Sequence, residues 1–207
     1  MYAKYFKRIL DFILSLLALI LLMPVMIVIG IAIKIDSKGP IFFLQERLGK
    51  SGKVFKIIKF RTMVVNAENI GDGLKVKSEN DSRITKVGKF LRKTSLDELP
   101  QLINVIKGEM SLIGPRPPVT YHPHKFEDYS KEQKQRFLVR PGITGLAQVR
   151  VRNSATWDER IKIDIEYIKK ITFIKDIGIV FKTVKNIISK ENIYQENVKK
   201  EKSNVRV

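Results

Sequence analysis

The sequence predicts an α+β protein that is attached to a membrane through a helix near its amino terminus. Three patterns lead to this prediction: a long apolar run, two short apolar segments separated by a turn region, and helical spacing in the remainder. We expect a membrane-inserted helical anchor over residues 1–36, a folded domain over residues 37–189 and a flexible polar tail over residues 190–207. A small β-hairpin or sheet and amphipathic interfacial helices should pack around one site at the membrane face.

The composition narrows the possible partners. The chain has a formal net charge of +18 over 207 residues, a length that fits one domain with a real core. Such a charge favours a polyanionic partner, namely nucleic acid, an anionic membrane surface or a phosphorylated substrate. Because there is no cysteine, disulfides, thiolate metal sites and a cysteine nucleophile are excluded.

The apolar run predicts membrane attachment. It spans 22 uncharged residues from Phe12 to Ile33, too long for a cleavable signal peptide, and a straight helix of this length would extend ~33 Å. Pro24 lies in its middle and removes a helix hydrogen bond, and basic residues flank the run on both sides. Two alternatives stay open: a re-entrant helix broken at Pro24, with both ends in one compartment, and a kinked helix that spans the bilayer.

The next segments predict a β-hairpin. Ile41–Gln45 and Val54–Phe60 are short and apolar, and the turn region Gly49–Lys53 separates them. From Asn66 to Ser82 the chain becomes polar, so we expect a loop there with one weak helical turn.

A short helix is predicted next. Its apolar residues have the i, i+3, i+4, i+7 spacing of one buried face, which consists of Leu99, Leu102, Ile103 and Ile106. The start has two interpretations, because Ser95 with Glu98 forms a capping-box pattern and Asp97 is also a suitable N-cap.

Asp97 and Glu98 are adjacent carboxylates in a cationic neighbourhood. A carboxylate in such surroundings ionises readily and can act on a phosphate that the cations hold. Spacing alone favours the simpler interpretation of Asp97 as a helix cap, and either way the pair lies at a helix N-terminus, which favours bound anions. The cations nearby in the sequence are Arg83, Lys86, Lys89, Arg92, Lys93, Lys107 and Arg116.

Two short motifs follow. Arg116 lies between prolines in Ile113–Pro118, so its guanidinium is held rigidly and can offer a planar fork to a phosphate. His122 and His124 suggest a metal site, but no third ligand accompanies them at a useful spacing, which favours a surface loop.

The last third is mainly helical. In Val139–Val149 two glycines at turn positions precede an alternating strand. Helices are expected over Trp157–Ile171 and Phe173–Ile188. The second helix has the pattern of a helix in a membrane interface, although a core-packed helix would look similar. Its apolar stripe is Ile177, Val180, Phe181, Val184, Ile187 and Ile188.

Four motifs in order resemble the bacterial sugar transferases, and more narrowly the small monotopic phosphoglycosyl transferases that act on polyprenyl phosphate. The resemblance extends from about Lys4 to about Ser189, and the four motifs together are far more specific than any one of them. They are Lys59–Met63, Ser95–Gln101, Gly108–Pro117 and Arg140–Gly145.

This resemblance implies a reaction. Enzymes of the family transfer a sugar-1-phosphate from a UDP-sugar to polyprenyl (undecaprenyl) phosphate and release UMP, the first membrane step of glycoconjugate synthesis. By the match, Asp97 is the nucleophile that forms a covalent phosphosugar intermediate, and Glu98 holds Mg²⁺. Expected phosphate contacts are Lys59, Arg92, Arg116 and Arg152. Asp164 and Tyr167 fall where the family shows an Asp and a Tyr, so they are also expected to bind the substrate.

The resemblance also implies a location and partners. Residues 37–189 would be the catalytic domain at the cytoplasmic face of the bacterial plasma membrane, with membrane lipids and possible downstream glycosyltransferases as partners and no nucleic acid. It favours the re-entrant helix. The chain departs from the family at Met23-Pro24, where Ser-Pro is common, and at Val151, where Gly is usual. The rival hypothesis is a non-catalytic membrane-anchored basic protein that binds nucleic acid or acidic lipid.

Overall fold

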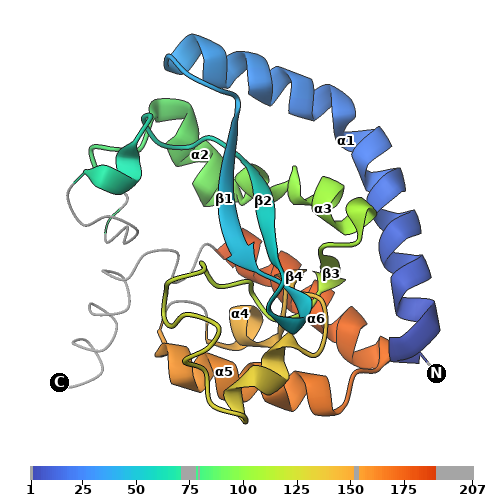
Figure 1. Cartoon of the computed structure of the whole chain (residues 1–207). Coiled ribbons are helices and arrows are strands. Elements are labelled where there is room, and N and C mark those ends of the chain that lie inside the picture. Colours follow the sequence, from blue (N-terminus) through green and yellow to red (C-terminus); the bar gives the residue numbers. More distant parts are fainter. Residues whose placement is uncertain (1, 71–77, 79, 152–153, 190–207) are drawn as a thin grey trace, which may run out of the picture.

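One long helix arches over a small α+β body in the computed structural model (Figure 1), which describes residues 2–70, 78, 80–151 and 154–189. The long helix is α1 (Lys7–Asp36), preceded by a π-helical turn, Tyr2–Phe6. The other helices are α2 (Lys86–Thr94), α3 (Gln101–Lys107), α4 (Leu146–Arg150), α5 (Trp157–Lys169) and α6 (Phe173–Ser189). The strands are β1 (Phe42–Leu48), β2 (Val54–Phe60), β3 (Ser111–Ile113) and β4 (Gly142–Thr144).

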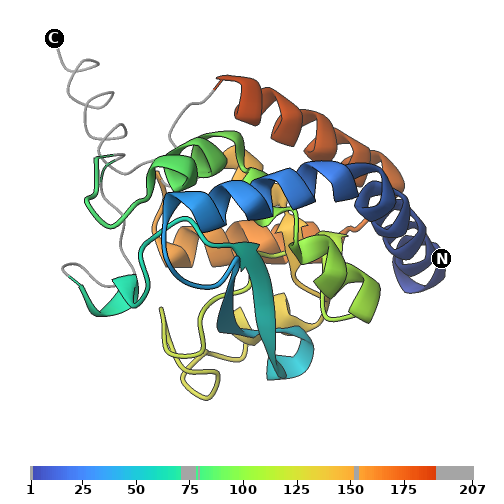
Figure 2. The same cartoon turned by 90° about the horizontal axis from the view of Figure 1, so that it is seen from above.

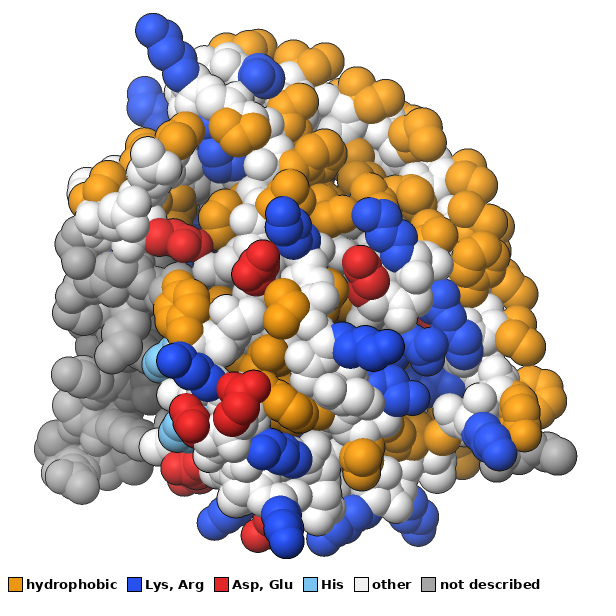
Figure 3. Space-filling model, viewed as in Figure 1, with side chains coloured by type: hydrophobic (Ala, Val, Ile, Leu, Met, Phe, Trp, Pro, Cys, Tyr) orange, Lys and Arg blue, Asp and Glu red, His pale blue; other side chains and the backbone are white. Residues whose placement is uncertain are grey.

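The path of α1 is bent, but the helix continues through Pro24 without a break (Figure 1). Among the described residues, Tyr2–Asp36 is the one helical stretch long and apolar enough to cross a membrane. Most of its apolar side chains are exposed, as the space-filling view shows along its outer surface (Figure 3). Leu21 is 76% exposed and Ile35 is 82% exposed, which is unusual for a helix in contact only with water.

Both ends of α1 are bonded to the same body. At its start, Arg8 Nη1 donates to the carbonyl of Val105 at 2.6 Å. At its end, the Val87 N–H donates to Asp36 Oδ2 at 2.9 Å, and Arg61 Nη2 donates to the carbonyl of Ser37 at 2.7 Å. The two ends of the apolar helix are therefore fixed relative to one folded unit.

The predicted β-hairpin is confirmed. Strands β1 and β2 pair antiparallel, from Phe42 opposite Phe60 to Leu48 opposite Val54. Phe55 and Ile57 pack beside α3, whereas Phe60 packs against α1 and α2. The hairpin thus contacts α1, α2 and α3, and it extends from beneath α1 along one side of the body, as seen from above in Figure 2.

The buried face of α3 differs from the predicted one. Leu102 is buried as expected, but Val105 is completely buried while Ile103 and Ile106 are only half-buried. The reason is a polar contact that periodicity does not reveal: the Asn104 side chain accepts from the N–H of Ile58 on β2 at 3.0 Å. This bond holds α3 with Asn104 against the hairpin, and the neighbouring Val105 packs with Phe55 and Ile57.

The alternating strand expected in Val139–Val149 is wrong beyond Thr144. Strand β4 ends there, pairs in parallel with β3, and is followed by helix α4. A Cβ atom on Gly145 would lie 2.0 Å from the carbonyl oxygen of Gly114, so these two segments of the chain approach so closely that only glycine fits. The chain turns at this contact, and Leu146 packs with Ile113 in the core.

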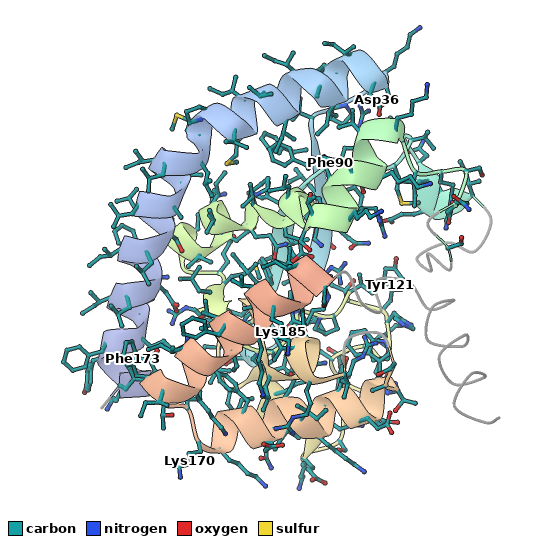
Figure 4. All side chains as sticks on the ribbon, turned by 180° about the vertical axis from the view of Figure 1, so that it is seen from behind. Asp36, Phe90, Tyr121, Lys170, Phe173 and Lys185 are labelled. Atoms are coloured by element: carbon teal, nitrogen blue, oxygen red, sulfur yellow. The ribbon has the colours of Figure 1, made fainter. Side chains whose placement is uncertain are left out.

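The two carboxyl-terminal helices are confirmed. Helix α6 buries Ile179 and exposes the predicted apolar stripe, with Phe181 72% exposed and Ile188 73% exposed. Phe173 at its start contacts the Tyr2 ring, with the ring centroids 5.7 Å apart, so α6 and the start of α1 lie together (Figure 4).

Candidate active site

Asp97 and Glu98 lie in a 3-10 turn, Leu96–Glu98, between α2 and α3. Neither predicted cap is present, because no side chain caps this turn or α3. The amides that would need a cap are bonded to backbone instead: Leu102 N–H donates to the Leu99 carbonyl at 3.1 Å, and Ile103 N–H to the Pro100 carbonyl at 3.0 Å. Both carboxylates are therefore available for other interactions.

Glu98 is held by two cations from distant parts of the chain. Lys59 Nζ on β2 donates to Glu98 Oε1 at 2.7 Å, and Arg116 Nη2 donates to the same oxygen at 3.3 Å. Burial would raise the pKa of Glu98, but Lys59 and Arg116 outweigh burial and lower the pKa to about 2. Oxygen Oε2 of Glu98 accepts no hydrogen bond from the described residues. Glu98 is thus a fixed anion whose second oxygen, Oε2, remains available to a ligand.

Asp97 is in the opposite situation. Among the described residues, nothing donates a hydrogen bond to its carboxylate or forms an ion pair with it. Burial raises the pKa of Asp97 to about 6, against the opposing effect of Lys59. One of the two adjacent carboxylates is therefore clamped, and the other is free.

The Pro-Arg-Pro loop is held by its backbone carbonyls. The Arg116 carbonyl accepts from Arg136 at 2.9 Å, the Pro117 carbonyl from Arg47 at 3.1 Å, and the Pro118 carbonyl from the Leu48 N–H at 3.0 Å. With its backbone fixed, Arg116 keeps a side chain that is 40% exposed. Its guanidinium can therefore contact both Glu98 and a ligand.

A groove of about 650 Å³ opens beside this site, within the size range of small-molecule pockets. One end is polar and includes Glu98, Arg92 and Arg116. The rest is mainly apolar and is formed by α1, α3, α4 and α6, with α6 as one long wall (Figure 4). The apolar lining includes Leu14, Leu99, Leu102, Leu112, Val180 and Ile187.

Three of the predicted phosphate contacts come together here. Lys59 and Arg116 contact Glu98 directly, and Arg92 lines the same groove while its Nη1 donates to Thr62 Oγ1 at 3.4 Å. Arg152 lies outside the described residues. Asp164 also lines the groove, but it is engaged in a buried ion pair with Arg136 Nη2 at 2.7 Å.

Tyr167 does not line this groove, in contrast to its predicted role in substrate binding. Its hydroxyl donates to Asp176 Oδ1 at 2.7 Å, and Asp176 Oδ2 also accepts from Tyr2 and from Lys7 at 2.8 Å. Burial and then Asp176 raise the pKa of Tyr167 well above its ordinary value. Tyr167 instead connects α5 and α6 to the start of α1.

The sequence interpretation missed Arg136 and Arg160, which both line the groove beside Trp157. Helical spacing could have indicated one of them, because Trp157, Arg160 and Asp164 at i, i+3 and i+7 share a face of α5. The histidine motif holds no metal cluster: His122 accepts from Trp157 Nε1 at 3.2 Å, and the described residues contain no group of three or more potential ligands.

Comparison with known proteins identifies the family. The model of the family described as bacterial sugar transferase matches residues 2–190. The chain belongs to this family. It is 44% identical over 89% of its length to a Klebsiella pneumoniae protein named UDP-glucose:undecaprenyl-phosphate glucose-1-phosphate transferase. It is 40% identical over 93% of its length to the undecaprenyl-phosphate galactose phosphotransferase of Salmonella typhimurium.

These relatives are longer proteins, and they are named for different sugars. A third, from Aeromonas hydrophila, is 43% identical over 89% of this chain and is named for UDP-N-acetylgalactosamine. The match covers 41%, 42% and 44% of the Klebsiella, Salmonella and Aeromonas proteins, so the chain spans about two fifths of their length. Similar identities to proteins named for three sugars leave the donor sugar open.

The unpaired state of Asp97 leads to a stability prediction. Replacing an N-cap aspartate with alanine typically lowers the free energy of unfolding by about 0.5–2 kcal/mol. Because Asp97 caps nothing and its half-buried carboxylate has no partner, we expect Asp97→Ala to leave the melting temperature unchanged or to raise it. Thermal unfolding of the purified protein in detergent measures this.

Glu98→Ala is the matched control. It leaves Lys59 and Arg116 without their shared anion, so the free energy of unfolding should fall by about 1–3 kcal/mol. A clear fall in melting temperature for Asp97→Ala would contradict the assignment of Asp97 as a free carboxylate.

Proposed function

We propose that this chain transfers a sugar-1-phosphate from a UDP-sugar to polyprenyl (undecaprenyl) phosphate and releases UMP, through a covalent intermediate on Asp97. The observation that carries this proposal is a pair of adjacent carboxylates, one clamped by cations and one free. The clamped one, Glu98, lines the polar end of a largely apolar groove, and Asp97 precedes it directly in the chain. The names of the relatives in Klebsiella and Salmonella support the substrate classes.

The first step needs a free carboxylate. An oxygen of Asp97 attacks the phosphorus that bears the sugar, the bond from this phosphorus to the UMP oxygen breaks, and UMP leaves with the electron pair. Lys59, Arg92 and Arg116 offset the charge of the diphosphate. In the second step a phosphate oxygen of the lipid attacks the same phosphorus, and the Asp97 carboxylate is released unchanged.

Glu98 fits the role of a Mg²⁺ ligand in a site of this kind. Mg²⁺ is usually bound through one or two carboxylates together with substrate phosphates and waters. Oε2 of Glu98 is the oxygen that Lys59 and Arg116 leave available. When bound, Mg²⁺ neutralises charge on the diphosphate. Among the described residues no larger acidic cluster exists, so the substrate would supply the remaining ligands.

The apolar part of the groove suits the lipid acceptor. Leu14 on α1, Leu102 on α3 and Ile187 on α6 come from three helices, and two of these helices also expose apolar side chains outward. A polyprenyl chain could then extend from the polar end toward the bilayer without crossing water. This arrangement supports a location at a membrane surface. We assign it to the cytoplasmic face of the bacterial plasma membrane, because the UDP-sugar donor is found on that side.

The bonded ends of α1 support a re-entrant helix. Arg8 at the start and Asp36 at the end are both attached to the body, so both ends face the compartment that contains the groove. Pro24 provides the bend in this interpretation, without the serine that is common before it in the family.

The reaction can be tested by assaying UMP. We expect purified protein to form UMP over many turnovers from at least one of a panel of UDP-sugars. This multiple turnover should require both undecaprenyl phosphate and Mg²⁺. Removing the metal with a chelator should abolish UMP formation, and added Mg²⁺ should restore it. Asp97→Asn should lower turnover by at least ~10⁴-fold, because the nucleophile is lost.

The control is Arg150→Gln, which removes an exposed ion pair with Glu166 and should retain activity. Absence of UMP with every donor of a broad panel would count against the proposal. Retained turnover in Asp97→Asn would exclude the covalent mechanism.

The topology can be tested by cysteine labelling, because the natural chain has no cysteine. Cysteines introduced separately at Ala3 and Lys38, both exposed, should react with a membrane-impermeant thiol reagent from the same side of the membrane. Leu21→Cys, in the apolar middle of α1, should be protected and serves as the control. Reaction of the first two sites from opposite sides would show that α1 spans the bilayer.

A further inference from the structure

A second cluster of cations borders the groove beyond Arg116. It consists of Arg136 and Arg160, which lie beside Trp157 and Asp164. The backbone of Arg116 connects the two clusters, because its carbonyl accepts from Arg136 while its side chain contacts Glu98. We call Arg136 and Arg160, together with the adjacent Trp157 and Asp164, the α5 corner. The name refers to helix α5, which provides three of these four residues.

Arg160 is the most informative member of the α5 corner. Its guanidinium lies over the Trp157 ring, with the carbon Cζ 5.5 Å from the ring centroid. It makes no hydrogen bond or ion pair with any described residue, and its Nε is buried. Burial and then Arg116 lower its pKa. Because buried donors without partners are rare, and because Arg160 also lines the groove, its guanidinium is a candidate to bind a ligand there.

Arg136 supports the α5 corner from behind. It is 2% exposed, and its Nη2 donates to Asp164 Oδ2 at 2.7 Å and to the Arg116 carbonyl at 2.9 Å. Its Nε and Nη1 have no hydrogen-bond partner among the described residues. A separate cavity of about 10 Å³ also borders Arg136 and has room for one water molecule. Arg160 is therefore the better candidate for direct contact with a ligand.

The local charge favours an anion. Arg136 and Arg160 carry two positive charges, and among the described residues the acidic side chain that lines the groove beside them is Asp164. Burial raises the pKa of Asp164 to about 6, despite the opposing effect of Arg136. The excess of cations remains at neutral pH, so a phosphate would be attracted here.

We propose that the α5 corner binds the nucleoside monophosphate half of the donor, with Arg160 contacting the nucleotide phosphate and Trp157 beside the base. This inference rests on the proposed function. A nucleotide combines an anion with a flat aromatic ring, which matches a guanidinium that lies over an indole. The lipid phosphate fits less well, because the apolar lining that would receive its chain lies on α1, α3 and α6 instead.

Trp157 provides a direct signal, because it is the only tryptophan in the chain. We expect UMP to change the intrinsic fluorescence of the full-length protein in nanodiscs, saturably and without any lipid substrate. Inorganic phosphate and farnesyl phosphate should change it only at much higher concentrations. If inorganic phosphate is as effective as UMP, the α5 corner does not recognise a nucleotide.

Arg160→Gln tests the assigned contact. We expect the Kd for UMP and the KM for the UDP-sugar to rise about 10- to 100-fold, as for a lost charge-assisted hydrogen bond, with the KM for polyprenyl phosphate unchanged. Arg160→Lys should recover part of the affinity. Arg150→Gln, which loses an exposed pair with Glu166, is the matched control and should bind UMP as the natural chain does. Melting temperatures within about 3 °C would show that the variants fold.

The outcomes separate this inference from the proposed function. A rise in the KM for polyprenyl phosphate alone would show that the α5 corner takes the lipid phosphate. An unchanged Kd for UMP in Arg160→Gln would also overturn the inference, even if this variant still catalysed the reaction. Conversely, UMP binding that depends on Arg160 would support the nucleotide site even if no donor in the panel were turned over.

Discussion

The ion pair between Glu98 and Lys59 joins the parts of the chain that build the site. Lys59 comes from the hairpin, Glu98 from the turn before α3, and Arg116 adds the proline-rich loop to the same oxygen. Charges that are largely removed from water are stable only when they are paired. The clamp on Glu98 therefore fixes the turn, and this turn presents Asp97 without using its carboxylate. The free state of Asp97 is a consequence of the bonds around its neighbour.

The same principle holds α1 against the body. Lys7 at the start of the helix pairs with Asp176 of α6 at 2.8 Å, and Tyr167 donates to the same carboxylate. At the other end, Arg61 donates to the carbonyl of Ser37. Between these polar attachments the helix exposes mainly apolar side chains. Apolar surface drives insertion into a bilayer, while the buried polar contacts at both ends set how the groove faces it.

Much of the fold could be predicted from the sequence, for identifiable reasons. The apolar run, the hairpin, α5 and α6 follow from hydrophobic patterns that single segments carry. The face of α3 could not be predicted, because the Asn104 contact with β2 depends on a strand 46 residues away. The end of β4 was also missed, since Gly145 is required by contact with the backbone of Gly114, which no local pattern shows.

The site shows the same division. Motif resemblance assigned Lys59, Arg116, Asp97 and Glu98 to one site, although spacing alone had favoured a cap for Asp97. In the structure Lys59 and Arg116 contact Glu98. The resemblance did not reveal Arg136, which reaches Trp157 only through tertiary packing, or Arg160, which shares a face of α5 with Trp157. Tyr167 was expected at the substrate, whereas its hydroxyl is used in a buried network with Asp176.

The central claim is that the unpaired carboxylate of Asp97 forms a covalent bond to the phosphosugar. Intact-protein mass spectrometry after incubation with UDP-sugar and Mg²⁺, without polyprenyl phosphate, tests it most directly. The account predicts a mass increase of one phosphosugar, located on the peptide that contains Asp97, which disappears when polyprenyl phosphate is added. An adduct that persists in Asp97→Asn, or steady turnover with no adduct at any time, would contradict it.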